Sequence, residues 1–98
     1  MKTASRIIQE LIPGYLDARR KEIPTMMELL AASDFERLRV LSHNLKGSGA
    51  SFGFSELTRF GAALEGYAEA WDPASFQVEL GRLKEYLEQL NPATNTNL

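Results

Sequence analysis

The chain has 98 residues, one histidine, no cysteine and a formal net charge of −2. A chain of this length forms one domain around a single hydrophobic core. The lack of cysteine excludes disulfides and thiolate chemistry, and the slightly acidic balance argues against nucleic acid or an anionic membrane as the main partner. No apolar run reaches the ~20 residues of a membrane span and no signal peptide is evident, so we expect a soluble, cytoplasmic protein.

Apolar residues recur at helical spacing along almost the whole chain, and no stretch alternates with the period of a strand. The first long helix is predicted to start at Ile12, with Pro13 in its first turn. Pro24 falls inside this pattern and is expected to kink the helix near Arg20 or to split it. The preceding residues, 3–10, are a candidate for a short extra helix across one end of the fold.

The second and third helices follow after short connections. Ser33, with Glu36 three residues later, has the spacing of a capping box and is predicted to cap the second helix. Gly53 is predicted to reverse the chain, because glycine adopts the left-handed conformation at low cost. Ser55 is then predicted to be the N-cap of the third helix.

The fourth helix is predicted to begin at Asp72-Pro73 and to end at Asn91-Pro92, which leaves residues 92–98 as a loose polar tail. Four helices joined by short connections pack as antiparallel neighbours. The predicted fold is therefore all-α, an antiparallel up-down four-helix bundle that forms one domain with its core over about residues 4–91.

His43 lies in the second predicted helix, where each residue advances about 100° around the axis. With Leu38 set at zero, His43 falls at about 140°, opposite the mean direction of the apolar positions, and is predicted to be exposed. The core side is expected to hold Leu38, Leu41, Leu45, Gly49 and Phe52. The exposed sector around His43 is expected to hold Glu36, Arg39, Val40, Lys46, Gly47 and Ala50.

The glycines near His43 require an explanation, because a glycine inside a helix costs about 1 kcal/mol relative to alanine. Helical side chains lean toward the N-terminus, so a larger residue in place of Gly47 would partly cover His43. The ammonium group of Lys46 can reach an anion bound to the imidazole. Gly49 and Gly61 fall on core-facing sides and are expected to permit close approach of two helices.

These residues form a recognisable motif. The stretch HNLKGSGA at residues 43–50, followed by Phe52-Gly53-Phe54 and then by Leu57 and Leu64-Glu65, resembles the signature of histidine-containing phosphotransfer (HPt) domains. The resemblance implies a phosphorelay intermediate of bacterial two-component signalling. Carried over to this sequence, it makes His43 the phosphoryl-accepting nucleophile, Lys46 a group that balances phosphate charge, and Gly47 a position that leaves room for docking. The remaining residues expected at the docking surface are Ala50, Arg39, Val40 and Glu36.

The resemblance also implies the partners. They are the receiver domains of response regulators, from which a phosphoryl group is taken and to which it is passed, with a hybrid sensor kinase as a further candidate. The chain itself is expected to be a monomer without cofactor or metal, and Mg²⁺ is expected on the receiver.

The residues are consistent with a carrier that has no active site of its own. A neutral imidazole is a competent nucleophile near pH 7, and the sequence has no Walker A motif, no kinase glycine loop and no acidic cluster suited to Mg²⁺. A self-sufficient enzyme is disfavoured, because one histidine without cysteine does not supply a three-ligand zinc site in the usual way. The alternative is a non-catalytic helical module that binds a partner through an exposed helix face, but it leaves His43, Lys46 and Gly47 unexplained.

Overall fold

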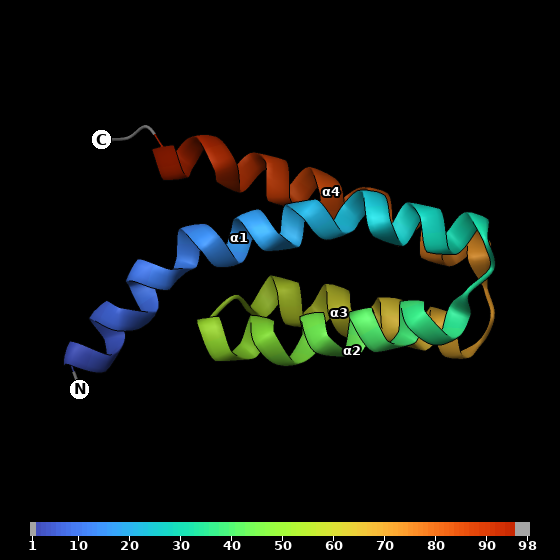
Figure 1. The fold of residues 1–98 in the computed structure, drawn as a ribbon, viewed down its shortest axis with the longest axis horizontal. Helices are drawn as coiled ribbons and strands as arrows, with labels where there is room; N and C mark the ends of the chain where they lie inside the picture. Colours follow the sequence, from blue (N-terminus) through green and yellow to red (C-terminus); the bar gives the residue numbers. More distant parts are fainter. Residues whose placement is uncertain (1, 96–98) are drawn as a thin grey trace.

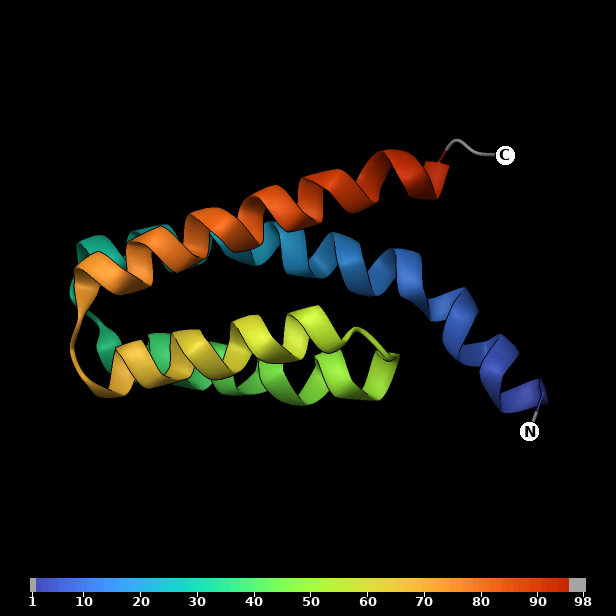
Figure 2. The same cartoon turned by 180° about the vertical axis from the view of Figure 1, so that it is seen from behind.

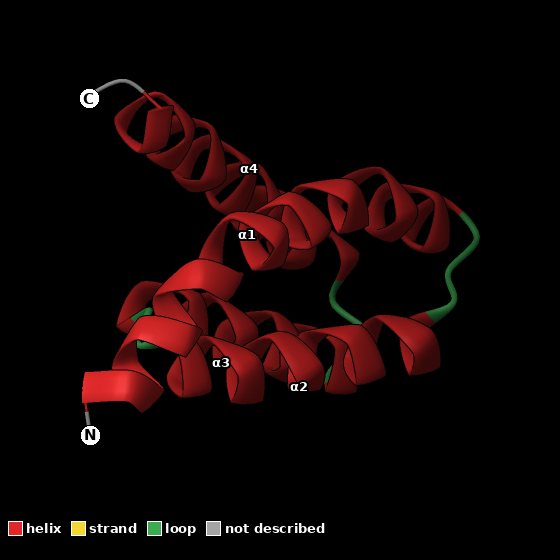
Figure 3. Ribbon diagram, turned by 60° about the vertical axis from the view of Figure 1, so that its left-hand side comes forward, coloured by secondary structure: helices red, strands yellow, loops and turns green. Residues whose placement is uncertain are grey.

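The computed structural model describes residues 2–95, with side chains described for residues 6–90. Its four helices are α1 (Lys2–Ala31), α2 (Phe35–Phe52), α3 (Ser55–Glu69) and α4 (Pro73–Asn95). Figure 1 shows α1 and α4 in one layer above α2 and α3, with each helix antiparallel to the one before it, and Figure 2 shows the same two layers from behind. α1 and α3 each pack against both α2 and α4. The predicted all-α, up-down four-helix bundle is confirmed, and Figure 3 shows only helices and connections in the described chain.

α1 is one continuous helix, although both Pro13 and Pro24 lie inside it. The prediction that Pro24 could split this helix is wrong, and so is the prediction of a separate short helix over residues 3–10. Both prolines are exposed, so water can solvate the carbonyls that lose their helical partner and the cost of each interruption is limited. The first turns of α1 bend past the end of the α2–α3 pair (Figure 1), which is where the extra helix was expected.

Each of the three connections places one residue in the left-handed region, two positions before the first residue of the next helix. These residues are Ser33 (φ 55°), Gly53 (φ 83°) and Trp71 (φ 55°). At Gly53 the chain reverses as predicted: the Gly53 N–H donates to the Ala50 carbonyl at 3.1 Å, and the Phe54 N–H donates to the Gly49 carbonyl at 2.8 Å. Such paired bonds close the end of a helix.

Two predicted helix caps are wrong. Ser33 is the left-handed residue that ends α1, and the N-cap of α2 is Asp34, whose side chain accepts the Arg37 N–H at 3.2 Å. The N-cap of α3 is Phe54, without a side-chain hydrogen bond, and Ser55 is the first helical residue. Serine is frequent both at caps and in turns, so the pattern could not separate the two positions.

The start of α4 is as predicted, and its end is not. Asp72 accepts the Ser75 N–H at 3.1 Å and Pro73 occupies the first helical position. The backbone stays helical to Asn95 instead of ending at Asn91-Pro92, because a proline removes a single N–H donor from the last turns. The predicted loose tail is therefore helical over residues 92–95, while residues 96–98 lie outside the described part.

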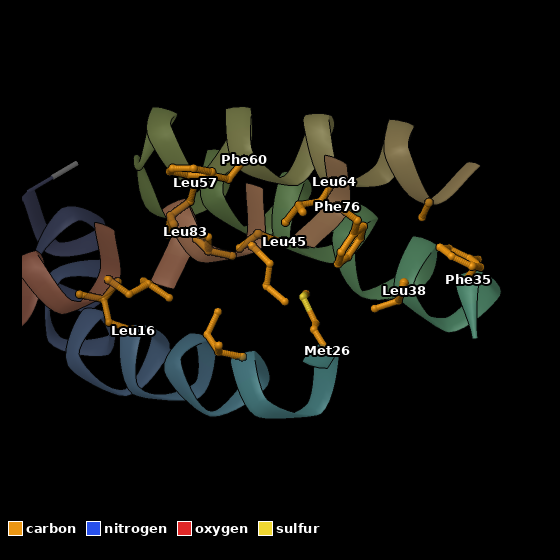
Figure 4. Packing of buried hydrophobic residues seen from close by; sticks show 14 of the residues in the cluster. Leu16, Met26, Phe35, Leu38, Leu45, Leu57, Phe60, Leu64, Phe76 and Leu83 are labelled. Carbon is orange, nitrogen blue, oxygen red and sulfur yellow. The ribbon is translucent and has the colours of Figure 1, made fainter. Parts of the chain in front are cut away.

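The core lies between the two layers and takes side chains from all four helices. Ten of them are labelled in Figure 4: Leu16, Met26, Phe35, Leu38, Leu45, Leu57, Phe60, Leu64, Phe76 and Leu83. Leu41 and Phe52, predicted on the core side of α2, are partly buried and pack against this core. Ser42 is fully buried and donates a hydrogen bond to the Leu38 carbonyl at 2.7 Å. None of the described helices combines the length and apolar character that crossing a membrane requires.

Candidate functional site

His43 lies in the middle of α2, and its side chain is 60% exposed. The exposure follows from the position of His43 on the helix, because another side of α2 faces the core. The residues buried on that side include Leu38, Ser42, Leu45 and Gly49. The predicted exposure of His43 is confirmed. The neighbours expected on the same exposed sector are exposed or half-buried: Glu36, Arg39, Val40, Lys46, Gly47 and Ala50.

A carboxylate from the next helix links His43 to Lys46. Glu65 of α3 contacts the imidazole Nδ1 of His43 through Oε2 at 3.0 Å and the Lys46 Nζ through Oε1 at 2.8 Å. The Glu65 side chain is only 13% exposed, whereas the Lys46 side chain is 38% exposed. We call His43, Lys46 and Glu65 the histidine cluster.

The close approach of α2 and α3 brings the histidine cluster together. A Cβ atom on Gly61 would lie 2.7 Å from the Lys46 Cα and nearer still to the Lys46 backbone nitrogen. Only glycine therefore lets α3 pass so near to Lys46. Glu65 follows Gly61 by one helical turn, and because the helices are antiparallel, one turn along α3 leads back from Lys46 to His43.

Gly49 makes a second close approach between the same helices, where a Cβ atom would lie 2.8 Å from the Thr58 backbone nitrogen. The predicted role of Gly49 and Gly61 in close helix packing is confirmed. Gly47 differs from both, since a Cβ atom at this position would meet nothing within 4 Å. Packing therefore gives no reason for glycine at position 47.

Hydrogen bonding sets the electrostatics of the histidine cluster. The hydrogen bond from Lys46 is the main cause that holds the pKa of Glu65 below its ordinary value, and the hydrogen bond from His43 acts in the same direction against partial desolvation. Glu65 is thus a carboxylate near neutral pH, and a carboxylate can only accept hydrogen bonds. The proton of this contact therefore belongs to Nδ1 of His43, and in the neutral ring Nε2 carries the free lone pair.

None of the hydrogen bonds or ion pairs of the described residues joins the other predicted docking residues to His43. Arg39 is paired with Glu36 at 2.7 Å, and the hydrogen bond from Arg39 lowers the pKa of Glu36. Val40 and Ala50 are exposed, one on either side of His43 along the helix.

Glu65 was not predicted as a site residue, although it falls within the motif. A contact between residues 22 positions apart is not visible in the pattern of one helix. The available signal was Gly61, a glycine on the core side of α3 one turn before an acidic residue.

The histidine cluster is on the exposed surface of α2 and α3, where the His43 side chain is 60% exposed. A separate hollow lies between α1 and α4, where Ile23, Leu30 and Leu80 are among its lining residues. Among the side chains described, no group of three or more histidine, cysteine, aspartate or glutamate residues could hold a metal ion. Any chemistry at His43 therefore takes place where a partner protein can cover it.

Comparison with known proteins identifies a family for most of the chain. A family model described as the Hpt domain matches residues 10–93, which include all three residues of the histidine cluster. The comparisons with curated proteins and with solved structures gave no match.

Proposed function

The chain belongs to the Hpt domain family, whose members are phosphocarrier modules of two-component systems, and we propose that His43 is the residue that carries the phosphoryl group here. The observation that supports this role is the histidine cluster. His43 is exposed, its Nδ1 is occupied by Glu65, and Nε2 is left free to react.

In the proposed reaction, the lone pair of Nε2 attacks the phosphorus of an aspartyl phosphate on a receiver domain. The new N–P bond forms as the acyl P–O bond breaks, and the electron pair of that bond goes to the receiver's aspartate. A second receiver aspartate then takes the phosphoryl group from Nε2 by the same route in reverse. Because the transition state is loose and anionic, in-line placement and charge stabilisation are what the two proteins must supply.

Lys46 is the cation that the histidine cluster offers to the transferring group. Its side chain is 38% exposed and its ammonium group is already oriented by Glu65, so it can interact with a phosphoryl oxygen on His43. No cofactor is proposed for this chain, and Mg²⁺ is assigned to the receiver. We further propose that the carrier acts as a monomer, and that a hybrid sensor kinase can present one of the receivers.

Docking of a receiver requires an open face around His43. Gly47 leaves space next to the imidazole, and Ala50 and Val40 present short side chains on the same face. An interaction module without chemistry would fit the same exposed face, but it would not need an imidazole whose Nδ1 is held by a carboxylate.

The single histidine makes a direct test possible, since an acid-labile, base-stable phosphate that is mapped to a histidine of this protein must be on His43. The purified protein is treated with phosphoramidate, a small donor that phosphorylates histidine, and separately with a phosphorylated receiver domain. The wild type and an Asn44→Ala control should take up acid-labile phosphate, and His43→Gln should take up none. His43→Gln should keep its stability within about 0.5 kcal/mol, because the site is exposed. A labelled His43→Gln variant, or an unlabelled wild type with both donors, would contradict the proposal.

A further inference from the structure

Arg39 lies one helical turn before His43, and its ion pair with Glu36 is weakly held. The Arg39 guanidinium donates to both carboxylate oxygens of Glu36, at 2.7 and 3.4 Å, and the Glu36 side chain is 74% exposed. Exposed ion pairs of this kind contribute little to stability, because water solvates both groups well when they separate. The guanidinium can therefore leave Glu36 when a stronger anion comes within its reach.

A phosphoryl group on His43 is an anion in the right place. Residues four apart on a helix have Cβ atoms about 5 to 6 Å apart, and Arg39 is offset from His43 by only about 40° around α2. Helical side chains lean toward the N-terminus, so the imidazole extends over the turn that carries Arg39. A phosphoryl group on the ring then lies within reach of the long arginine side chain.

The charges of the histidine cluster favour a contact with Arg39. Lys46 is bound to Glu65 at 2.8 Å, and the Glu65 side chain is only 13% exposed, so this pair is held more firmly than the exposed pair of Arg39 and Glu36. Phosphorylation adds nearly two negative charges close to the Glu65 carboxylate at neutral pH. The single charge of Lys46 does not offset both groups, and a second cation is needed.

We propose that Arg39 exchanges its ion pair with Glu36 for one with the phosphoryl group on His43, and that Glu36 is the anion that competes with this contact. The inference rests on the proposed role of His43. A planar guanidinium can bind two phosphoryl oxygens at once, and the phosphoryl group carries more charge than the carboxylate that it displaces. Arg39 thus stabilises the phosphorylated carrier, whereas Glu36 favours passing the phosphoryl group on.

The charged groups that surround Arg39 are acidic. The hydrogen bond to Glu36 is the main cause that raises the pKa of Arg39, and the charges of Glu69 and Glu65 on α3 act in the same direction. α4 does not pack against α2. Arg39 therefore keeps its positive charge, and the proposed exchange takes place between anions, without transfer of a proton.

Arg37 provides a matched control on the same helix. Its side chain is 75% exposed and is paired with Asp34 at 3.5 Å, so Arg37→Gln removes the same charge from a similar exposed ion pair. Arg37 lies about 120° around α2 from His43, however, and a phosphoryl group on the ring is outside its reach. An effect of Arg39→Gln that Arg37→Gln lacks is therefore due to the position of the charge.

The first measurement is ³¹P NMR after treatment with phosphoramidate, which needs no receiver. It follows the pH at which the phosphoryl group on His43 takes up its second proton. Arg39→Gln should raise the pKa of this group by about half a pH unit, the size expected for a unit charge about 5 Å away in water. Arg37→Gln should leave it nearly unchanged.

Glu36→Gln tests the competition, because it removes the anion that holds Arg39 in the resting state. This substitution should lower the pKa of the phosphoryl group when Arg39 is present. In the Arg39→Gln background the lowering should shrink to the small direct effect of the lost carboxylate charge, and the difference measures the coupling between the two residues. Equal lowering in both backgrounds would overturn the exchange.

The second measurement is the equilibrium between the carrier and one phosphorylated receiver domain. Docking contacts change the rate of transfer but not the equilibrium between the separated proteins, so a role of Arg39 in docking alone leaves the equilibrium unchanged. We expect Arg39→Gln to shift it toward the receiver by about threefold, which corresponds to half a pH unit in the pKa, and Glu36→Gln to shift it toward the carrier.

Failure of this inference is distinguishable from failure of the proposed function. If wild-type His43 takes up no phosphoryl group from either donor, the proposed function and this inference are both overturned. If His43 is phosphorylated but Arg39→Gln and Arg37→Gln give the same phosphoryl pKa and the same equilibrium, only the inference is overturned and His43 remains the carrier.

Discussion

Gly47 lies in the middle of α2 on its exposed face, where a Cβ atom would meet nothing within 4 Å. Gly47→Gln should therefore stabilise the domain, since glutamine is a good helix former and glycine costs about 0.5 to 1 kcal/mol in a helix interior. For a domain of this size, a gain of this magnitude corresponds to a rise in Tm of roughly 2 to 8 °C.

The same substitution should impair phosphoryl transfer. A glutamine at this position leans toward the N-terminus of α2, over the turn that carries His43, and occupies space that a docking receiver needs. A misplacement of the reacting atoms by 1 Å can cost about a hundredfold in rate, so we expect transfer to slow by about ten- to a hundredfold. Gly47→Ala should be as stable as the glutamine variant and intermediate in rate.

The assay compares urea or thermal unfolding with the rate of transfer to one receiver domain. Gly81→Gln is the matched control, because Gly81 is an exposed glycine inside α4 and a Cβ atom there also meets nothing within 4 Å. The control should gain similar stability and transfer at the wild-type rate. A Gly47→Gln variant that is more stable and fully active would refute the explanation of this glycine as docking space.

Three further predictions test the structure around the site. Lys46→Ala should slow transfer by a factor that corresponds to about 1 to 3 kcal/mol without abolishing it, because Lys46 is not the nucleophile; the measurement is the transfer rate at low salt. Gly61→Ala should destabilise the domain in urea unfolding by about 1 to 3 kcal/mol, less the helical gain of alanine, because the added Cβ meets the backbone of Lys46. Leu45→Ala should cost about 2 to 5 kcal/mol in the same assay, whereas Val40→Ala on the exposed face should stay within about 0.5 kcal/mol.

The features predicted correctly from sequence are those that depend on a single helix. The exposure of His43 follows from its position relative to Leu38 and Leu45, and a helix of regular pitch leaves little freedom in that relation. The number and order of the helices follow in the same way from the spacing of apolar residues.

The errors occur where local signals are ambiguous. Ser33 and Trp71 occupy the left-handed position that glycine occupies at Gly53, so two of the three helix ends lack the residue that usually marks them. Pro24 predicts an interruption of the helix, because proline lacks the backbone N–H. In the structure it lies on the exposed side of α1, and the packing of α1 against α2 and α4 maintains the helix across it.

The surroundings of the His43 ring show what can be predicted from the sequence and what cannot. The ring of His43 is 60% exposed because of where His43 lies on α2, and that depends on one helix alone. Nδ1 meets Glu65 only because Gly61 lets α3 approach the backbone of Lys46 and the turn at Gly53 sets the register of the two helices. The exposure of His43 could therefore be predicted from the sequence, whereas the group that contacts Nδ1 depends on the packing of two helices. For this reason Gly61, which touches neither nitrogen, is as necessary to the histidine cluster as Glu65 itself.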